Sequence, residues 1–86
     1  MNGNSDNLYD KVVWVTYAYL GPAADRFVSR QIRNHLHKEP EQLKKNDLKN
    51  LIDWINIAMN LLSNDDRLVA RYVAELQELS LSKGRV

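Results

Sequence analysis

The feature that most constrains this chain is the helical spacing of its apolar residues. Between positions 48 and 62 they recur every three or four residues, which is the period of one face of an α-helix. The main stripe consists of Leu48, Leu51, Ile52, Ile55, Met59 and Leu62. It is widened by Trp54, Ala58 and Leu61. Since a helix with two apolar sides is typical of a buried position, this segment is predicted to be central and covered on both flanks.

Residues 8–20 show the same period and are predicted to form the first helix. Several of these residues are β-branched, which also suits a β-strand. A helix is favoured because the chain offers no second strand with which such a strand could pair. Gly21 and Pro22 then predict a sharp corner, because glycine suits the position after a helix and proline suits the first turn of the next. We therefore expect the first helix to end near Leu20 and the second to begin at Pro22.

The remaining segments complete an all-helical pattern. The second helix is expected to bury a face made of Ala24, Phe27, Val28, Ile32 and Leu36. Pro40 opens one extra short helical turn that tucks Leu43 inward, and Asn46 is expected to cap the third helix. An acidic cap, Asp65 and Asp66, precedes the fourth helix. That helix is expected to bury Leu68, Val69, Tyr72, Val73, Leu76 and Leu79.

These segments together predict the fold class. It is all-α, a compact bundle of four main helices with one extra short helical turn. At 86 residues the chain is expected to form a single helical domain over 1–86. Its polar start, residues 1–5, is predicted to be a flexible lead, and residues 82–86 a flexible tail.

The composition indicates the cellular compartment of the protein and limits the range of its possible binding partners. There is no cysteine, which excludes a disulfide framework and favours a reducing compartment. The start of the chain shows no export signal, and no segment approaches the ~20 apolar residues of a membrane span. The formal net charge is +1, so there is no overall attraction to nucleic acid or acidic lipid. We therefore expect a cytoplasmic protein that engages no membrane.

No residue pattern predicts catalysis, a cofactor or a metal site. The serines lack the setting of a nucleophile, and three glycines are too few for a phosphate-binding loop. His35 and His37 are two residues apart, which points them to different faces of a helix and keeps them from sharing a metal ion. Glu75 and Glu78 lie one turn apart and could form an acid–base pair, but a solvated helix face explains them better. The protein is expected not to be an enzyme.

A basic stripe is one candidate binding site. Arg26, Arg30 and Arg33 follow one another at i, i+4 and i+7 on the predicted second helix. This spacing lines guanidinium groups up along phosphates or carboxylates. Three lysines are expected to lie close by, namely Lys44, Lys45 and Lys49. Three interpretations stay open: a solvated helix face, a site for an acidic protein, and a nucleic-acid site.

The aromatic residues of the first helix are the other candidate. Trp14 and Tyr17 add more apolar surface than one neighbouring helix covers, which is typical of an association site. The alternative is that Trp14 and Trp54 fill the core together. The sequence does not decide between these two interpretations.

Two stretches resemble known helical families. Tyr19–Ala24, running on through Arg30–Ile32, resembles the short "LGP" helical modules of bacterial signalling and regulatory proteins. Pro40–Leu43, with Asp47–Trp54 and Ala58, is similar to small uncharacterised helical proteins of cyanobacteria. Together the two stretches cover about two thirds of the chain. The resemblance implies a helical module that carries no catalytic residues.

The sequence as a whole predicts a non-enzymatic module that binds another protein or a second copy of itself. Its partner-binding residues are expected to be Trp14, Tyr17, Arg26, Arg30 and Arg33. The alternative is a small nucleic-acid-associated regulator that uses the three arginines together with the three lysines.

Overall fold

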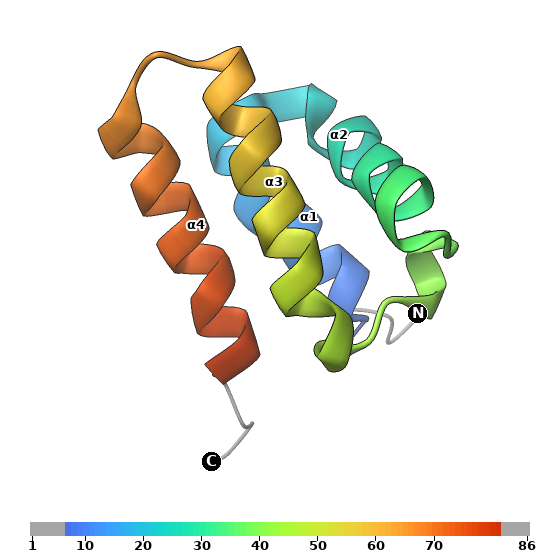
Figure 1. The fold of residues 1–86 in the computed structure, drawn as a ribbon. Helices are drawn as coiled ribbons and strands as arrows, with labels where there is room; N and C mark the ends of the chain where they lie inside the picture. The colour runs from blue at the N-terminus through green and yellow to red at the C-terminus, as the bar shows by residue number, and fades with distance from the viewer. Residues whose placement is uncertain (1–6, 82–86) are drawn as a thin grey trace.

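Four α-helices that run alternately up and down build the structure, a computed structural model in which residues 7–81 are described (Figure 1). They are α1 (Leu8–Leu20), α2 (Ala24–Gln31), α3 (Leu48–Leu62) and α4 (Asp66–Leu81). α1 packs against α2 and α4, and α3 packs against α4 and α2. The predicted all-α bundle of four main helices is confirmed. The predicted lead and tail, 1–5 and 82–86, lie outside the described residues.

The corner between α1 and α2 lies where the sequence predicted it. The Gly21 N–H donates to the Tyr17 carbonyl oxygen, which closes α1. Gly21 has φ 60° and ψ −138°, a conformation that residues with a Cβ rarely adopt. The second α-helix does not begin at Pro22, however, because a 3-10 turn, η2 (Gly21–Ala23), comes first. This tighter turn lets the Ala24 N–H reach the Gly21 carbonyl oxygen directly after the reversal.

The second helix ends earlier in α form than predicted. After Gln31 the chain continues as a π-helical turn, η3 (Ile32–Leu36), and His37 follows in the left-handed conformation with φ 58° and ψ 40°. Histidine is one of the few side chains that are enriched in this conformation. On the predicted inward face, the buried residues are Ala24, Val28 and Ile32, and the half-buried ones are Phe27 and Leu36.

The link between α2 and α3 contains the predicted short turn. This turn, η4 (Pro40–Gln42), is a 3-10 turn in which the Gln42 side chain accepts a hydrogen bond from the Glu39 N–H at 2.8 Å. Pro40 and Leu43 are buried, as predicted for Leu43. Because η4 packs against α1, the link closes one end of the bundle.

A second 3-10 turn in the same link corrects the predicted start of α3. Asn46 does not cap the helix, because it lies inside the turn η5 (Lys45–Asp47), after which α3 begins. The Asp47 carboxylate holds this turn, since its Oδ2 accepts from the Lys44 N–H at 3.0 Å and from Lys38 Nζ at 2.7 Å. The hydrogen bond from Lys38, against the opposing effect of burial, lowers the pKa of Asp47 below its usual value.

The core lies between the four helices and is mostly aliphatic. Its large fully buried apolar side chains are Val12, Val28, Ile32, Leu48, Leu51, Ile55, Met59, Tyr72 and Leu76. The α4 face follows the prediction, with Val69, Tyr72 and Leu76 buried and Leu68, Val73 and Leu79 half-buried.

One buried polar pair joins α1 to α4 inside this core. The hydroxyl oxygens of Thr16 and Tyr72 lie 2.5 Å apart, and Thr16 Oγ1 also lies 2.8 Å from the Val12 carbonyl oxygen. Since the Thr16 hydroxyl has one proton and gives it to Val12, the Tyr72 hydroxyl donates to Thr16. The Tyr72 ring also stacks on Tyr19, with ring centroids 4.8 Å apart. The contact therefore satisfies a tyrosine hydroxyl that water does not reach.

Candidate interaction surfaces

Trp14 and Tyr17 lie on the outer side of α1. This helix buries Val12 and Thr16, and successive helical residues are turned by about 100°, so Trp14 points away from the core. Trp14 is 78% exposed and Tyr17 is 55% exposed. The alternative in which Trp14 and Trp54 fill the core together is therefore wrong.

A shallow hollow lies beside Trp14, between α1 and α4. It has a volume of about 370 Å³ and is lined by Asp10, Lys11, Trp14, Val15 and Leu79. The lining combines apolar walls with two charged groups. Such a lining suits an apolar side chain that a partner inserts next to the indole ring.

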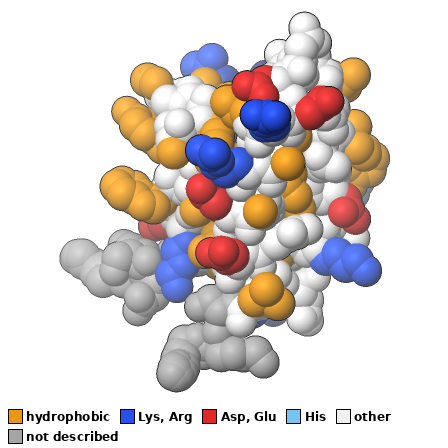
Figure 2. All heavy atoms as spheres, turned by 90° about the vertical axis from the view of Figure 1, so that its left-hand side faces the viewer, with side chains coloured by type: hydrophobic (Ala, Val, Ile, Leu, Met, Phe, Trp, Pro, Cys, Tyr) orange, Lys and Arg blue, Asp and Glu red, His pale blue; other side chains and the backbone are white. Residues whose placement is uncertain are grey.

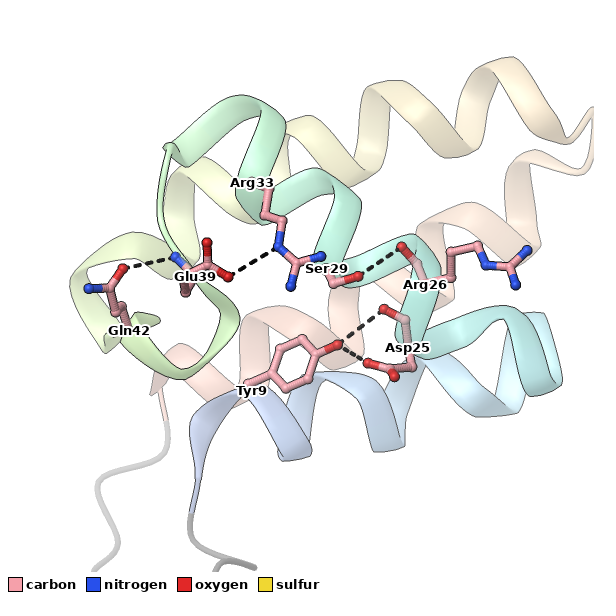
Figure 3. A network of polar contacts seen from close by, with 7 residues as sticks. All are labelled: Tyr9, Asp25, Arg26, Ser29, Arg33, Glu39 and Gln42. Carbon is pink, nitrogen blue, oxygen red and sulfur yellow. Dashed lines mark hydrogen bonds and ion pairs between the residues drawn. The ribbon is translucent and has the colours of Figure 1, made fainter.

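A hydrogen-bonded contact fixes α1 against α2. The Tyr9 hydroxyl contacts Asp25 twice, donating to its carboxylate Oδ1 and lying 3.1 Å from its backbone carbonyl oxygen (Figure 3). Burial, and then the Asp25 carboxylate, raise the pKa of Tyr9 above its usual value, so the hydroxyl keeps its proton. The contact holds the outer sides of α1 and α2 in a fixed relation.

The predicted basic stripe lies on the outer side of α2 and η3. Arg26, Arg30 and Arg33, which we call the arginine face, are all exposed. A shallow hollow of about 240 Å³ on this face is lined by Arg26, Ser29, Arg30, Arg33 and Asn34. Arg33 Nε lies 3.2 Å from Glu39 Oε1, and because both side chains are more than half exposed, the pair is weak (Figure 3). In the described part of the chain, neither Arg26 nor Arg30 forms an ion pair.

The structure does not gather the predicted residues into one pocket. The hollow beside Trp14 is lined by α1 and α4, whereas the arginine hollow is lined by α2 and η3. The expectation that Lys49 lies near the arginines is wrong, because Lys49 lines a third hollow between α3 and α4. The candidate site is therefore a pair of surfaces on neighbouring helices.

Two residues that the sequence assigned to the apolar stripe of the third helix, Trp54 and Leu61, are exposed in the structure together with Ile57. Trp54, Ile57 and Leu61, which we call the α3 row, are 39%, 51% and 83% exposed. Leu62, predicted inward, is 67% exposed. α3 is flanked as predicted, by α4 on one side and by α2 and η3 on the other, but these neighbours leave the side that carries these residues open to solvent. Figure 2, seen from the α4 side, shows apolar side chains at both edges and in the middle of this face, with charged side chains scattered among them.

The α3 row has one fixed member. The His35 ring stacks on the Trp54 indole with ring centroids 3.8 Å apart and planes 6° from parallel. His35 is half-buried. The stack covers one side of the indole and holds its orientation, while part of the ring stays open to solvent. The sequence signal for this surface is Ile57, which with Trp54 and Leu61 completes a row at spacings of three and four.

The titratable groups outside these surfaces are dispersed. Within residues 7–81 no group of three or more histidine, aspartate or glutamate side chains is close enough to hold a metal ion. Glu75, Glu78 and His37 are exposed. None of the helices described is both long and apolar enough to cross a bilayer.

The geometry defines a small helical bundle with two exposed apolar faces and one basic face. Comparisons with protein-family models, with curated proteins and with solved structures give no match for this chain. Its surfaces are therefore interpreted from their own chemistry.

Proposed function

We propose that this protein is a non-enzymatic interaction module that binds an acidic segment of another protein through α1 and the arginine face. The exposure of Trp14 is the observation that carries the proposal. The core is filled without it, so its indole adds nothing to the packing of the bundle. Exposed tryptophans beside a hollow are typical anchors of protein interfaces, where a few aromatic side chains supply most of the binding energy.

The hollow beside Trp14 supports binding of an apolar side chain. Val15 and Leu79 give it apolar walls, and the neighbouring Tyr17 widens the aromatic surface along α1. A partner side chain that fills the hollow would remove these groups and the indole from water together. Such desolvation is the main source of affinity at the centre of an interface.

The arginine face supports an acidic partner. Guanidinium groups bind carboxylates through paired, charge-assisted hydrogen bonds, and Arg26 and Arg30 are exposed for such contacts. Phosphate backbones are bound more tightly by larger cationic surfaces. Here Glu39 engages Arg33, and Lys49 lies on another side of the molecule. These features favour a protein partner over a nucleic acid.

The setting of the module is part of the proposal. A chain without cysteine suits a reducing compartment, and we place the module in the cytoplasm. The resemblance of Tyr19–Ala24 to bacterial signalling modules supports a bacterial, regulatory role.

Differential capture tests the apolar half of the site. Immobilised wild type, Trp14→Ala and the control Leu62→Ala are incubated with lysate of the source cell, with and without nuclease. Leu62 is a matched control because it is also apolar and highly exposed but lies on α3. We expect a protein that survives nuclease, is retained by wild type and Leu62→Ala, and is lost with Trp14→Ala. Equal capture by all three proteins would contradict the proposal.

A charge reversal tests the basic half. Arg30→Glu should lose the same captured protein, whereas Arg67→Glu, an equal change of charge at an exposed site of α4, should retain it. Two results would instead establish the nucleic-acid alternative. Nuclease would remove the captured material, and the protein would be retained on heparin in a salt-sensitive way that Arg30→Glu abolishes.

A further inference from the structure

The α3 row needs an occupant different from the one proposed for α1. Its three side chains follow one another at spacings of three and four, so they form a continuous stripe along the solvent side of the helix. This is the spacing with which helices pack side by side in pairs. The stripe therefore has the shape of a helix-pairing surface.

The charge around the row shows which kind of partner it suits. From Trp54 to Asn64 the chain carries no charged residue. The exposed polar neighbours of the row are mainly asparagines, Asn50, Asn56, Asn60 and Asn64. Asp53 is the charged residue of α3 next to the row, so a strongly charged partner finds little complement on this surface, whereas a second copy can meet it without setting like charges against each other. The α1 surface differs, because the arginine face beside it would repel its own copy.

The area of the row is sufficient for the core of a small symmetric interface. Applied to ordinary side-chain areas, the exposed fractions give about 350 Å² of apolar surface on each copy. A specific interface removes about 800 Å² from each partner, of which the polar rim is a large part. The surrounding asparagines and Asp53 supply such a rim. The expected interface lies at the small end of the range, so pairing depends on concentration.

One orientation fits the row best. With two antiparallel α3 helices related by a two-fold axis near Ile57, Trp54 of one copy meets Leu61 of the other. Asp53 then lies beside Asn60 of the second copy, and the two Asp53 carboxylates stay apart. The stack on His35 already orients Trp54, which reduces the entropy lost when the surfaces meet.

From these observations we infer that the α3 row is the interface of a two-fold symmetric homodimer with antiparallel α3 helices. The inference is independent of the proposed function, since it uses the opposite apolar face. A dimer built this way carries two α1 surfaces, one on each copy, so it presents the proposed binding site twice.

Sedimentation equilibrium with the full chain tests the inference. Over roughly 10 μM to 1 mM, a range suited to a small interface, the wild-type mass should rise from 10.0 kDa towards twice that value. Leu61→Lys should weaken the association at least about tenfold, because it buries an unpaired ammonium group in the interface. Leu62→Lys is the matched control, one residue along and turned by about 100° away from the row. It should associate as the wild type does.

The outcomes separate the possible interfaces. Circular dichroism checks that each variant is folded. If Leu61→Lys is not folded, Ile57→Lys is used in its place. In a Trp14→Phe background, the remaining Trp54 should shift its fluorescence to the blue as the concentration rises. A wild type that stays at 10.0 kDa throughout overturns the inference. So does an association that Leu62→Lys weakens as much as Leu61→Lys, or that Trp14→Phe abolishes.

Discussion

The hydrogen bond between Tyr72 and Thr16 gives a quantitative test of how the core is built. In Tyr72→Phe the Thr16 hydroxyl still donates to the Val12 carbonyl oxygen, so no buried donor is left without an acceptor. The loss should be about 0.5–1.5 kcal/mol, the net contribution of one hydrogen bond. Thr16→Val instead strands the buried Tyr72 hydroxyl, which should cost about 1–3 kcal/mol. The asymmetry follows from the direction in which the two protons are donated.

The double variant separates the hydrogen bond from the side chains that form it. Once either partner is replaced, the hydrogen bond between Thr16 and Tyr72 is already lost, so the two losses should not add. We expect the sum of the single losses to exceed the loss in the double variant by about 1 kcal/mol. Urea unfolding followed by far-ultraviolet circular dichroism measures all four proteins, and each 1 kcal/mol corresponds to a shift in Tm of about 4–8 °C. If the losses of unfolding free energy in the two single variants add up in the double variant, the hydrogen bond between Thr16 and Tyr72 would be refuted.

The same residue makes stability depend on alkaline pH. Burial raises the pKa of Tyr72 to about 12 from its ordinary value of 10.0. A raised pKa means that the folded state favours the neutral phenol, so this contribution is complete below pH 10 and is lost as the pH rises through about 12. Tyr72→Phe should therefore flatten the fall in unfolding free energy over that range. An unchanged slope would contradict the buried position of the hydroxyl.

Two further predictions concern the links between helices. Gly21→Ala should lower the free energy of unfolding by about 1–3 kcal/mol through backbone strain alone, because φ is +60° and no atom lies within 4 Å of the added methyl group. Gly21→Ser should lower it by the same amount. An unchanged Tm in thermal unfolding would be inconsistent with the conformation of this corner. Asp47 has a lowered pKa, chiefly from its hydrogen bond with Lys38, so its contribution is present above pH 3.8 and is lost as the pH falls through the lower folded value. Asp47→Asn should make acid unfolding curves shallower below pH 3.8, and an unchanged acid limb would count against the Lys38–Asp47 contact.

Much of the fold could be read from local signals. The corner at Gly21 and the inward residues of α4 follow from glycine and proline chemistry and from apolar spacing, both of which depend only on neighbouring residues. The start of α3 could not be read in the same way. Asn46 was predicted to cap the helix, but the carboxylate of Asp47 holds a 3-10 turn before it through Lys44 and Lys38, and Lys38 is brought to it only by the folded link.

The exposed surfaces were predictable only in part. The arginine face follows from its spacing alone, since every alternative placed it on the outside. Trp54 and Leu61 were predicted to be core because apolar spacing shows which side of a helix could be covered, not whether a neighbour covers it. How far α2, the π-helical turn at Ile32–Leu36 and α4 cover α3 depends on how these segments pack, which local spacing does not show. The separation of Lys49 from the arginines likewise depends on how α3 packs on α4.

The most direct test of the central proposal is the affinity of the captured protein for Trp14→Ala, compared with wild type and Leu62→Ala in calorimetric titrations. Circular dichroism and urea unfolding establish that all three proteins are equally folded. We predict that Trp14→Ala binds at least about tenfold more weakly, as expected for an aromatic anchor, while Leu62→Ala binds as the wild type does. Unchanged affinity in a folded Trp14→Ala protein would show that α1 is not the binding surface.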